Sequence, residues 1–394
     1  GFYRLPEPDS GDMFFDMEGD PLEIGGLVYL FGLWCWEEGG WAFKAFWAHD
    51  RAQERVAFEQ FMDFVQERRR QFPRAHVYHY ASYEETALKR LASFHATREV
   101  EMDNLLRHGV LVDLYKVVRE GLRISEPSYS IKYVEHFYRR AREGDVQNAG
   151  ASIVYYERWR ETGDPKLIED IAAYNKDDVE STQQLRDWLL DLRPERLPWR
   201  EAATAEPARD SAEPTVVQKI ELRLAEYRRR LVGPLPTDPH AWGVVERASE
   251  LTYQLLDFHR RAAKPEWWAL FARMDLDEQE LMDDPECLAG LTLDPEAPPT
   301  RVARSMLYTY RAPEQETKLA DGDQVTRCDT GGSIGSLMFA EATRTGQVKL
   351  GPSKQPLPER LSIGPSGPID SKKISAALFR FADRWLAGER RYDA

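Results

Sequence analysis

The order of strand-like and helix-like segments in the first half of the chain is the feature that most constrains its fold. Apolar runs separated by glycine pairs predict three successive strands, at 13–18, 27–36 and 41–48. The segments that follow alternate between helix and strand, at 51–70, 76–80, 84–91, 110–115 and 165–192. Helices that alternate with strands pack on the faces of a sheet, so residues 1–192 are expected to form one α/β domain.

The second half of the chain is organised differently. Residues 193–214 are rich in Pro, Ala and charge and have no apolar face, which predicts a linker. The next segment, 215–300, is expected to form a stalk of two antiparallel helices. This expectation rests on apolar residues spaced three and four apart: Val217, Ile220, Leu224, Tyr227, Leu231, Val244, Ala248, Leu251, Leu255 and Phe258. Short strands between turns predict a small antiparallel β-barrel at 301–370, and an amphipathic C-terminal helix is expected at 371–394.

Composition limits the partners and the location of the protein. The 394 residues include 53 basic and 67 acidic side chains, and the net charge of −14 argues against bulk electrostatic capture of nucleic acid but not against a local basic groove. No apolar run approaches the roughly 20 residues of a membrane span. Three distant cysteines without a CxxC motif predict a cytoplasmic setting and no zinc or iron–sulfur site. A first residue of Gly rather than Met indicates a processed or excised piece of a longer protein.

Two acidic residues on the first predicted strand form a candidate metal site. Asp16 and Glu18 lie two residues apart, so both side chains project from the same face of the strand. Two carboxylates on a buried face repel one another and resist desolvation unless a cation joins them. A divalent metal is the simplest remedy. The alternative is a strand that runs into a turn, with its acids in solvent at the edge of the sheet.

The long helix at 165–192 supplies a third carboxylate. Tyr174 and Asp178 are four residues apart and therefore lie on one stripe of the helix. Asp178 also shares a face with Ile171 and Leu185, which directs it towards whatever the helix packs on. The alternative roles are a surface aspartate for Asp178 and an aromatic core contact for Tyr174.

A fourth candidate ligand comes from the segment in which the strand at 76–80 leads into the next helix. Glu84 lies in the first helical turn, where an acid is favoured by the free amide groups and the helix dipole. Helix capping and metal binding are therefore both open for Glu84. Asp113 ends the strand at 110–115 and competes for the same role.

The order FFDMEGDP, HYASYE and YNKDDVESTQQLRDWL resembles the DEDD-type 3′-to-5′ exonucleases of the DnaQ-like group, which have the ribonuclease H-like fold. The DxE motif of that family matches Asp16 and Glu18. Its YxxxD motif, which marks the tyrosine subclass, matches Tyr174 and Asp178. The resemblance implies a ribonuclease H-like α/β exonuclease domain in the first half of the chain, in which Tyr174 orients the attacking water or the scissile phosphate.

The second motif of that family departs from its usual form in this sequence. His79 stands where the family has Asn, and Glu84 stands where it has Asp. A glutamate side chain is one methylene longer than an aspartate side chain, so it can still reach a metal, but from a backbone that lies further away. A histidine cannot form the same hydrogen bonds as the amide of an asparagine. The ligands of two Mg²⁺ or Mn²⁺ ions that the resemblance implies are Asp16, Glu18, Glu84 and Asp178.

A narrower resemblance extends over most of the chain. The segments DMEGDP, YHYASYE, YNKDDVEST, FHRRAAKPEWW and YTYRAPEQETKL resemble the middle region of bacterial fusions of a RecB-like nuclease with a superfamily 1 helicase. In such proteins an exonuclease-like domain precedes a helical stalk, a β-barrel and the helicase motor. The sequence contains no GxxxxGK[ST] loop, so the motor is expected elsewhere in the same full-length polypeptide.

Together these residues predict a function. Arg139 and Arg140 adjoin aromatic residues between the motifs and, with His79, are expected to contact single-stranded DNA. The main hypothesis is a metal-dependent 3′-to-5′ exonuclease that hydrolyses single-stranded DNA in DNA processing or repair. Two alternatives stay open: a catalytically inactive nuclease-like module that binds strands or partners, and an RNA exonuclease, because no residue pattern identifies a reader of the 2′-hydroxyl.

Overall fold

The chain divides into two compact units, Gly1–Glu213 and Pro214–Ala394. The computed structural model describes residues 1–139, 149–200, 216–354 and 356–389. Most of the predicted linker lies outside the described residues. Its described part, 193–200, packs on the first unit, where the Arg200 amide donates to the Leu5 carbonyl at 3.3 Å.

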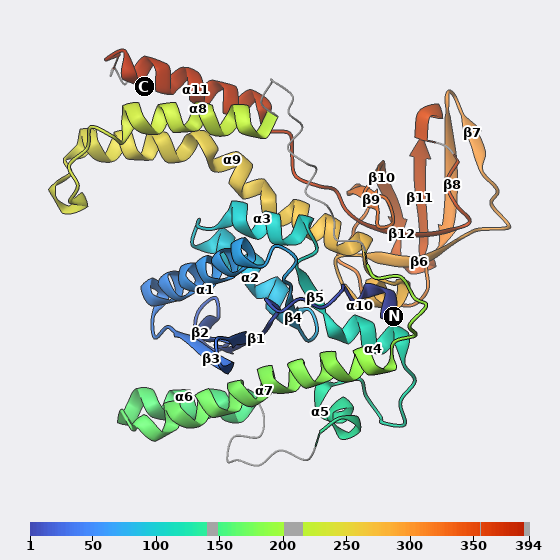
Figure 1. The fold of residues 1–394 in the computed structure, drawn as a ribbon. Coiled ribbons are helices and arrows are strands. Elements are labelled where there is room, and N and C mark those ends of the chain that lie inside the picture. The colour runs from blue at the N-terminus through green and yellow to red at the C-terminus, as the bar shows by residue number, and fades with distance from the viewer. Residues whose placement is uncertain (140–148, 201–215, 355, 390–394) are drawn as a thin grey trace. The chain divides into compact units, whose positions relative to one another are not determined.

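The first unit is built on a five-stranded mixed sheet with the strand order β3-β2-β1-β4-β5 (Figure 1). Its strands are β1 (Met13–Asp20), β2 (Leu27–Glu37), β3 (Gly40–Trp47), β4 (Val77–His79) and β5 (Leu111–Asp113). β1 pairs antiparallel with β2 and parallel with β4, and β4 pairs parallel with β5. The predicted strands are all present, although β4 and β5 are shorter than expected.

Helices cover both faces of this sheet, as Figure 1 shows. They are α1 (Arg51–Gln71), α2 (Tyr83–Phe94), α3 (Glu99–Arg107), α4 (Leu114–Gly121), α5 (Ile131–Val134), α6 (Ala149–Thr162) and α7 (Pro165–Leu192). α1 packs on β2 and β3, whereas α7 packs on β1, β2 and β4 from the other side. β2 is apolar along nearly its whole length because both of its faces are buried.

Helices α3, α4, α5 and α6 were not predicted from the sequence. The strand at 110–115 was also predicted to extend too far, because the chain changes to helix at Leu114. The physical reason is a helix cap. The carboxylate of Asp113 accepts from the Tyr115 amide at 2.9 Å and so begins α4.

Side chains on β1 alternate between the two helical layers. The ring of Phe15 stacks on Phe61 of α1 with centroids 4.3 Å apart. The ring of Phe14 instead lies 4.8 Å from the guanidinium of Arg186 on α7. Because the period of a strand is two residues, Asp16 and Glu18 also face α7.

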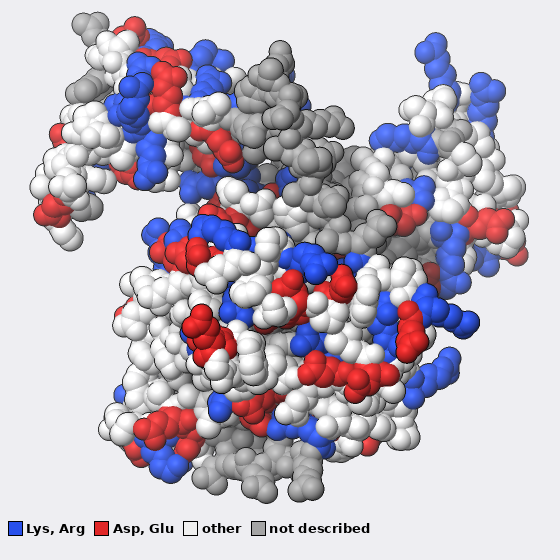
Figure 2. Space-filling model, in the orientation of Figure 1, with Lys and Arg blue, Asp and Glu red and all other residues white. Residues whose placement is uncertain are grey.

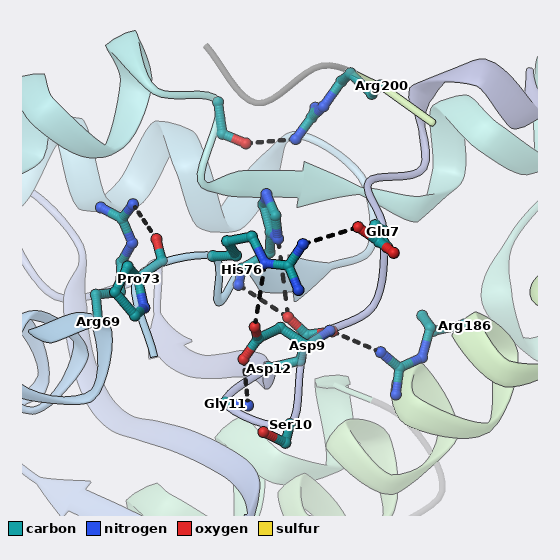
Figure 3. A network of polar contacts seen from close by, with 12 residues as sticks. Glu7, Asp9, Ser10, Gly11, Asp12, Arg69, Pro73, His76, Arg186 and Arg200 are labelled. Carbon is teal, nitrogen blue, oxygen red and sulfur yellow. Dashed lines mark hydrogen bonds and ion pairs between the residues drawn. The ribbon is translucent and has the colours of Figure 1, made fainter. Parts of the chain in front are cut away.

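A buried ion pair anchors α7 to the start of β1 (Figure 3). Arg186 donates from Nη1 to Asp12 Oδ2 at 2.8 Å, and the backbone amide of His76 donates to Asp12 Oδ1 at 3.0 Å. The Arg186 guanidinium also lies over the rings of Phe14 and Tyr78. One arginine therefore connects the helix to β1 and to β4.

Replacing Arg186 with Leu should lower the free energy of unfolding of the first unit by about 3 kcal/mol, because Asp12 would keep a buried charge without its partner. Urea denaturation of the full chain measures this. The control is Arg74→Leu, since Arg74 pairs with Glu7 at 2.9 Å but is 67% exposed. It should change the free energy by no more than about 0.5 kcal/mol. Equal losses in the two variants would contradict the anchoring role.

The helices of the second unit are α8 (Val216–Leu231), α9 (Val244–Met274), α10 (Glu278–Asp283) and α11 (Lys372–Leu386). α9 packs against both α8 and α11, so the C-terminal helix shares a core with the two helices that were expected to pair as a stalk. That core contains Leu224, Tyr227, Leu231, Leu256, Phe379, Ala382 and Trp385. No helix in the described part of the chain is long and apolar enough to cross a membrane.

The prediction for the buried face of α9 was wrong in part, since Ala248 packs on the core but three of the other predicted residues are exposed. Val244, Leu251 and Phe258 are 84%, 59% and 49% exposed, whereas Leu256 is 5% exposed and Ser249 is 8% exposed. The indole of Trp385 on α11 donates to Ser249 Oγ at 3.0 Å. Polar side chains therefore lie on the packing face of α9, and the apolar spacing alone selected a neighbouring stripe about 100° round the helix.

The rest of the second unit is a closed β-barrel of six strands, with a seventh strand paired at its edge. The strands are β6 (Leu288–Leu293), β7 (Thr300–Val302), β8 (Ser305–Arg311), β9 (Gln324–Arg327), β10 (Ser333–Ala340), β11 (Thr345–Leu350) and β12 (Arg360–Pro365). β11 pairs with β8 and closes the ring, and β7 extends β8 as a hairpin. The barrel begins at Leu288, earlier than the predicted boundary at residue 301.

Leu256→Ala should lower the free energy of unfolding of the second unit by about 2–4 kcal/mol, because it leaves a cavity in the core shared by α8, α9 and α11. Leu251→Ala on the same helix is the matched control and should change it by about 0.5 kcal/mol or less, since Leu251 is 59% exposed. Thermal and urea unfolding of the two variants compare them. A larger loss for Leu251→Ala would mean that the other face of α9 is buried.

Candidate metal centre

Three carboxylates converge where α7 crosses β1. Asp16 and Glu18 project from β1 towards α7, and Asp178 projects from α7. One oxygen from each of the three side chains lies within 4.8 Å of the other two. Glu18 is buried, while Asp16 and Asp178 keep partial exposure. The cluster is therefore enclosed by protein but still reachable from solvent.

Burial and mutual repulsion make these acids hard to ionise together. Burial raises the pKa of Asp16 well above its ordinary value, and the charges of Asp178, Glu18 and Glu84 raise it further. Burial and the charge of Asp178 likewise raise the pKa of Glu18 to about 8, despite hydrogen bonds that favour its charged form. Burial and mutual repulsion thus favour the protonated forms of Asp16 and Glu18 in this cluster.

Asn175 is a functional candidate that the sequence analysis missed. Its side chain is fully buried, and Nδ2 donates to Asp16 Oδ2 at 2.7 Å. The Asn175 side chain also favours the charged form of Glu18 and so opposes the rise in the pKa of that carboxyl. Because Asn175 precedes Asp178 by three residues, helical spacing alone places both on one side of α7, and this signal could have identified it.

A second group of hydrogen bonds holds Glu18 from α6. Ser152 is fully buried and hydrogen-bonds both Glu18 and the Tyr29 hydroxyl, the latter at 2.8 Å. Tyr29 stacks on Tyr156 of the same helix with centroids 3.9 Å apart. Lys132 of α5 also acts on Glu18, since its charge lowers the pKa of that carboxyl.

Glu84 adjoins the three carboxylates without belonging to the closest group. It lies in the first turn of α2, is 5% exposed, and lies near enough to Asp16 that its charge raises the pKa of that carboxyl. Its Oε2 lies 3.5 Å from His79 Nδ1. Asp113 is engaged elsewhere, because its Oδ1 accepts from the amides of Ala81 and Tyr115 at 2.8 and 2.9 Å. Of the two alternatives for the fourth ligand, the structure brings only Glu84 to Asp16.

The structure does not support a direct contact between His79 and nucleic acid. His79 is 1% exposed, and its Nδ1 donates to the Ala81 carbonyl at 2.8 Å. Burial alone would lower its pKa, but the nearby carboxylates of Glu84 and Asp113 outweigh that effect and raise the pKa to about 9. A protonated His79 therefore serves as a buried positive charge beside Glu84, with its Nδ1 3.5 Å from Oε2.

The contacts that were predicted between Arg139, Arg140 and single-stranded DNA gain no support from the structure. Arg139 forms an ion pair with Asp177, its Nη1 donates to the Asp177 carbonyl at 3.1 Å, and its side chain is only 14% exposed. It therefore ties the chain after α5 to α7, and the structure does not support a strand contact. Arg140 lies outside the described residues. Tyr174 lies on α7 one turn before Asp178 and is 8% exposed.

A comparison with known families agrees with this fold and acidic cluster. Residues 13–190 match the family model described as the RNase_H superfamily. The match and the mixed sheet support an RNase H-like domain of the nuclease type, and RNase H-like nucleases usually use divalent metals. No curated protein and no solved structure gives a significant match to the chain.

The residues present fit an oxygen-preferring divalent cation such as Mg²⁺ or Mn²⁺. Such cations bind carboxylates, and Asp16, Glu18 and Asp178 offer them at mutual distances that suit shared coordination. Among the described residues, the buried Oε2 of Glu84 has no hydrogen-bond donor. A cation would satisfy this oxygen and relieve the repulsion that raises the pKa values of Asp16 and Glu18.

In the presence of a chelator, the free energy of unfolding of the first unit should fall as the pH rises from 4.5 to about 8. The pKa of Glu18 is raised across this window, so the folded state holds a proton that the unfolded state has released. Glu18→Gln should flatten this slope and stabilise the chelated protein at pH 8 by about 1–2 kcal/mol.

Thermal and urea unfolding across this pH range measure both effects. Glu38→Gln, at an exposed position in the turn between β2 and β3, is the matched control and should keep the wild-type slope. A Glu18→Gln protein that is less stable than the wild type at pH 8 would show that the carboxylates do not repel one another.

Proposed function

We propose that the first unit is a metal-dependent 3′-to-5′ exonuclease that hydrolyses phosphodiester bonds of single-stranded DNA. The observation that carries the proposal is the convergence of Asp16, Glu18 and Asp178 within 4.8 Å. Their positions match the DxE and YxxxD motifs of the DEDD-type enzymes that the sequence resembles. The RNase H-like match supports the broader class, a nuclease.

In the proposal Asp16, Glu18 and Asp178 hold two divalent cations, with Glu84 as the further ligand next to Asp16. Bound cations of this kind lower the pKa of water and stabilise the charge that develops on a leaving oxygen. Tyr174 lies one helical turn before Asp178 and donates its hydroxyl hydrogen to the attacking water or the scissile phosphate. His79, held as a cation, keeps the carboxylate of Glu84 oriented.

The strand is recognised locally rather than by overall charge. On the face in Figure 2, Lys and Arg side chains lie among Asp and Glu and do not gather in one basic area. The charge of Lys132 lowers the pKa of Glu18, so Lys132 lies near the acidic cluster. In the proposal Lys132, rather than Arg139, is the cation that contacts a backbone phosphate. The narrower resemblance extends the proposal to DNA processing or repair together with a helicase motor of the same polypeptide.

The wild-type protein should shorten a 5′-labelled single strand from its 3′ end and release mononucleotides in Mg²⁺ or Mn²⁺. Asp16→Ala and Asp178→Ala should each reduce the rate at least about 10³-fold, because a lost ligand removes several kcal/mol of transition-state stabilisation. The matched control is Asp191→Ala, an exposed position near the end of α7, which should keep the wild-type rate.

Blocked and ribose-containing strands decide direction and sugar preference. A 3′-blocked strand should resist hydrolysis, and a 5′-blocked strand should not. If an RNA strand is hydrolysed faster than a DNA strand of the same sequence, RNA rather than DNA is the preferred substrate. Equal activity in wild-type and Asp16→Ala preparations would point to a contaminant and favour a module that binds strands without cleaving them.

A further inference from the structure

We propose that Asn175, seated against Gly32, is a positioning residue that fixes Asp16 and Glu18 in the geometry that binds a divalent cation. This inference rests on the proposed function only in assigning a cation to the same carboxylates. Asn175 contributes no charge and need not contact the ion. It acts through the two strand carboxylates, by a hydrogen bond to Asp16 and by favouring the charged form of Glu18.

The amide is placed where it reaches both acids of β1. Nδ2 donates to Asp16 Oδ2 at 2.7 Å, and the same side chain favours the charged form of Glu18. The side chain is 0% exposed, so water does not compete for the hydrogen bond to Asp16. One neutral group thus restricts two carboxylates that would otherwise rotate away from each other.

Gly32 makes this position of the amide possible. It lies directly opposite Asp16 in the pairing of β2 with β1. A Cβ atom at residue 32 would lie 1.5 Å from Asn175 Oδ1 and 2.7 Å from Asn175 Cγ, far inside van der Waals contact. The amide of Asn175 therefore occupies the space that a side chain at residue 32 would fill.

A comparison with a second contact of α7 shows why the hydrogen-bond donor to Asp16 is better neutral than charged. Near the end of the helix, Arg186 neutralises Asp12 with a charged guanidinium at 2.8 Å, and that contact serves stability. At Asp16 the same helix presents an amide, which orients a carboxylate without cancelling its charge. The attraction of Asp16 and Glu18 for a cation is preserved. Outer groups that orient ligands in this way typically change metal affinity about 10–100-fold.

The test measures Mn²⁺ binding to the full chain by isothermal titration calorimetry, without any strand present. Asn175→Ala should weaken Mn²⁺ binding about 10–100-fold. Strand hydrolysis by this variant should need correspondingly more Mn²⁺ but recover towards the wild-type rate at saturating metal. A role in folding alone would not produce this recovery. The control Asn104→Ala, at an exposed position on α3, should bind Mn²⁺ as the wild type does.

A double-mutant cycle tests the pairing with Gly32. Gly32→Ala should displace the amide and weaken Mn²⁺ binding about as much as Asn175→Ala does. The double variant should be no weaker than either single variant, because the methyl group added at position 32 fills space that the shortened side chain at position 175 leaves. It also supplies a folded protein without the amide if a single variant fails to fold. Gly351→Ala is the glycine control, since a Cβ there meets nothing within 4 Å.

The outcomes separate this inference from the proposed function. Wild-type affinity in Asn175→Ala or in the double variant would overturn the inference, even if the protein hydrolyses strands. Additive losses in the cycle would also overturn the pairing of Asn175 with Gly32, and so would a wild-type protein that binds no Mn²⁺. Weakened Mn²⁺ binding in these variants of a protein that cleaves no strand would support the inference while the proposed function fails.

Discussion

The mutual repulsion of Asp16, Glu18 and Asp178 is the constraint on which the rest of the first unit depends. The pleat of β1 and the position of α7 bring these acids together, and partial burial reduces the screening of their charges by water. Packing elsewhere must offset this, and the apolar contacts of α7 with the sheet and the Asp12–Arg186 pair contribute to it. A cation that binds the three carboxylates would therefore also stabilise the folded first unit, because it binds only when β1 and α7 have brought them together.

Local periodicity was enough to predict much of the acidic cluster. The period of a strand placed Asp16 and Glu18 on one face, and the period of a helix placed Asp178 on a packing face. Contacts between distant parts of the chain were beyond such reasoning. The partners Asp12 and Arg186 are 174 residues apart, and the sequence around either residue gives no signal that the two form an ion pair. Arg139 looked like a free cation for the same reason, since its partner Asp177 comes from another helix.

The second unit shows a different limit. The helices and the barrel were predictable as elements, because their spacing and turns are local properties. The packing face of α9 was not, since the buried stripe contains Ser249 and Thr252. A polar residue can be buried when a specific donor or acceptor meets it, as Trp385 meets Ser249. Which of two stripes is buried then depends on α11, which lies far along the chain from α9.

The contact between Gly32 and Asn175 has a consequence for how such domains diverge. A relative that acquires any larger residue at position 32 loses room for the amide opposite Asp16, so its residue at position 175 is released from selection. The two positions should therefore covary across homologous sequences. Lineages that keep the glycine and the asparagine together would be those whose acidic cluster still holds a cation, and the joint loss of both would mark domains retained for another purpose.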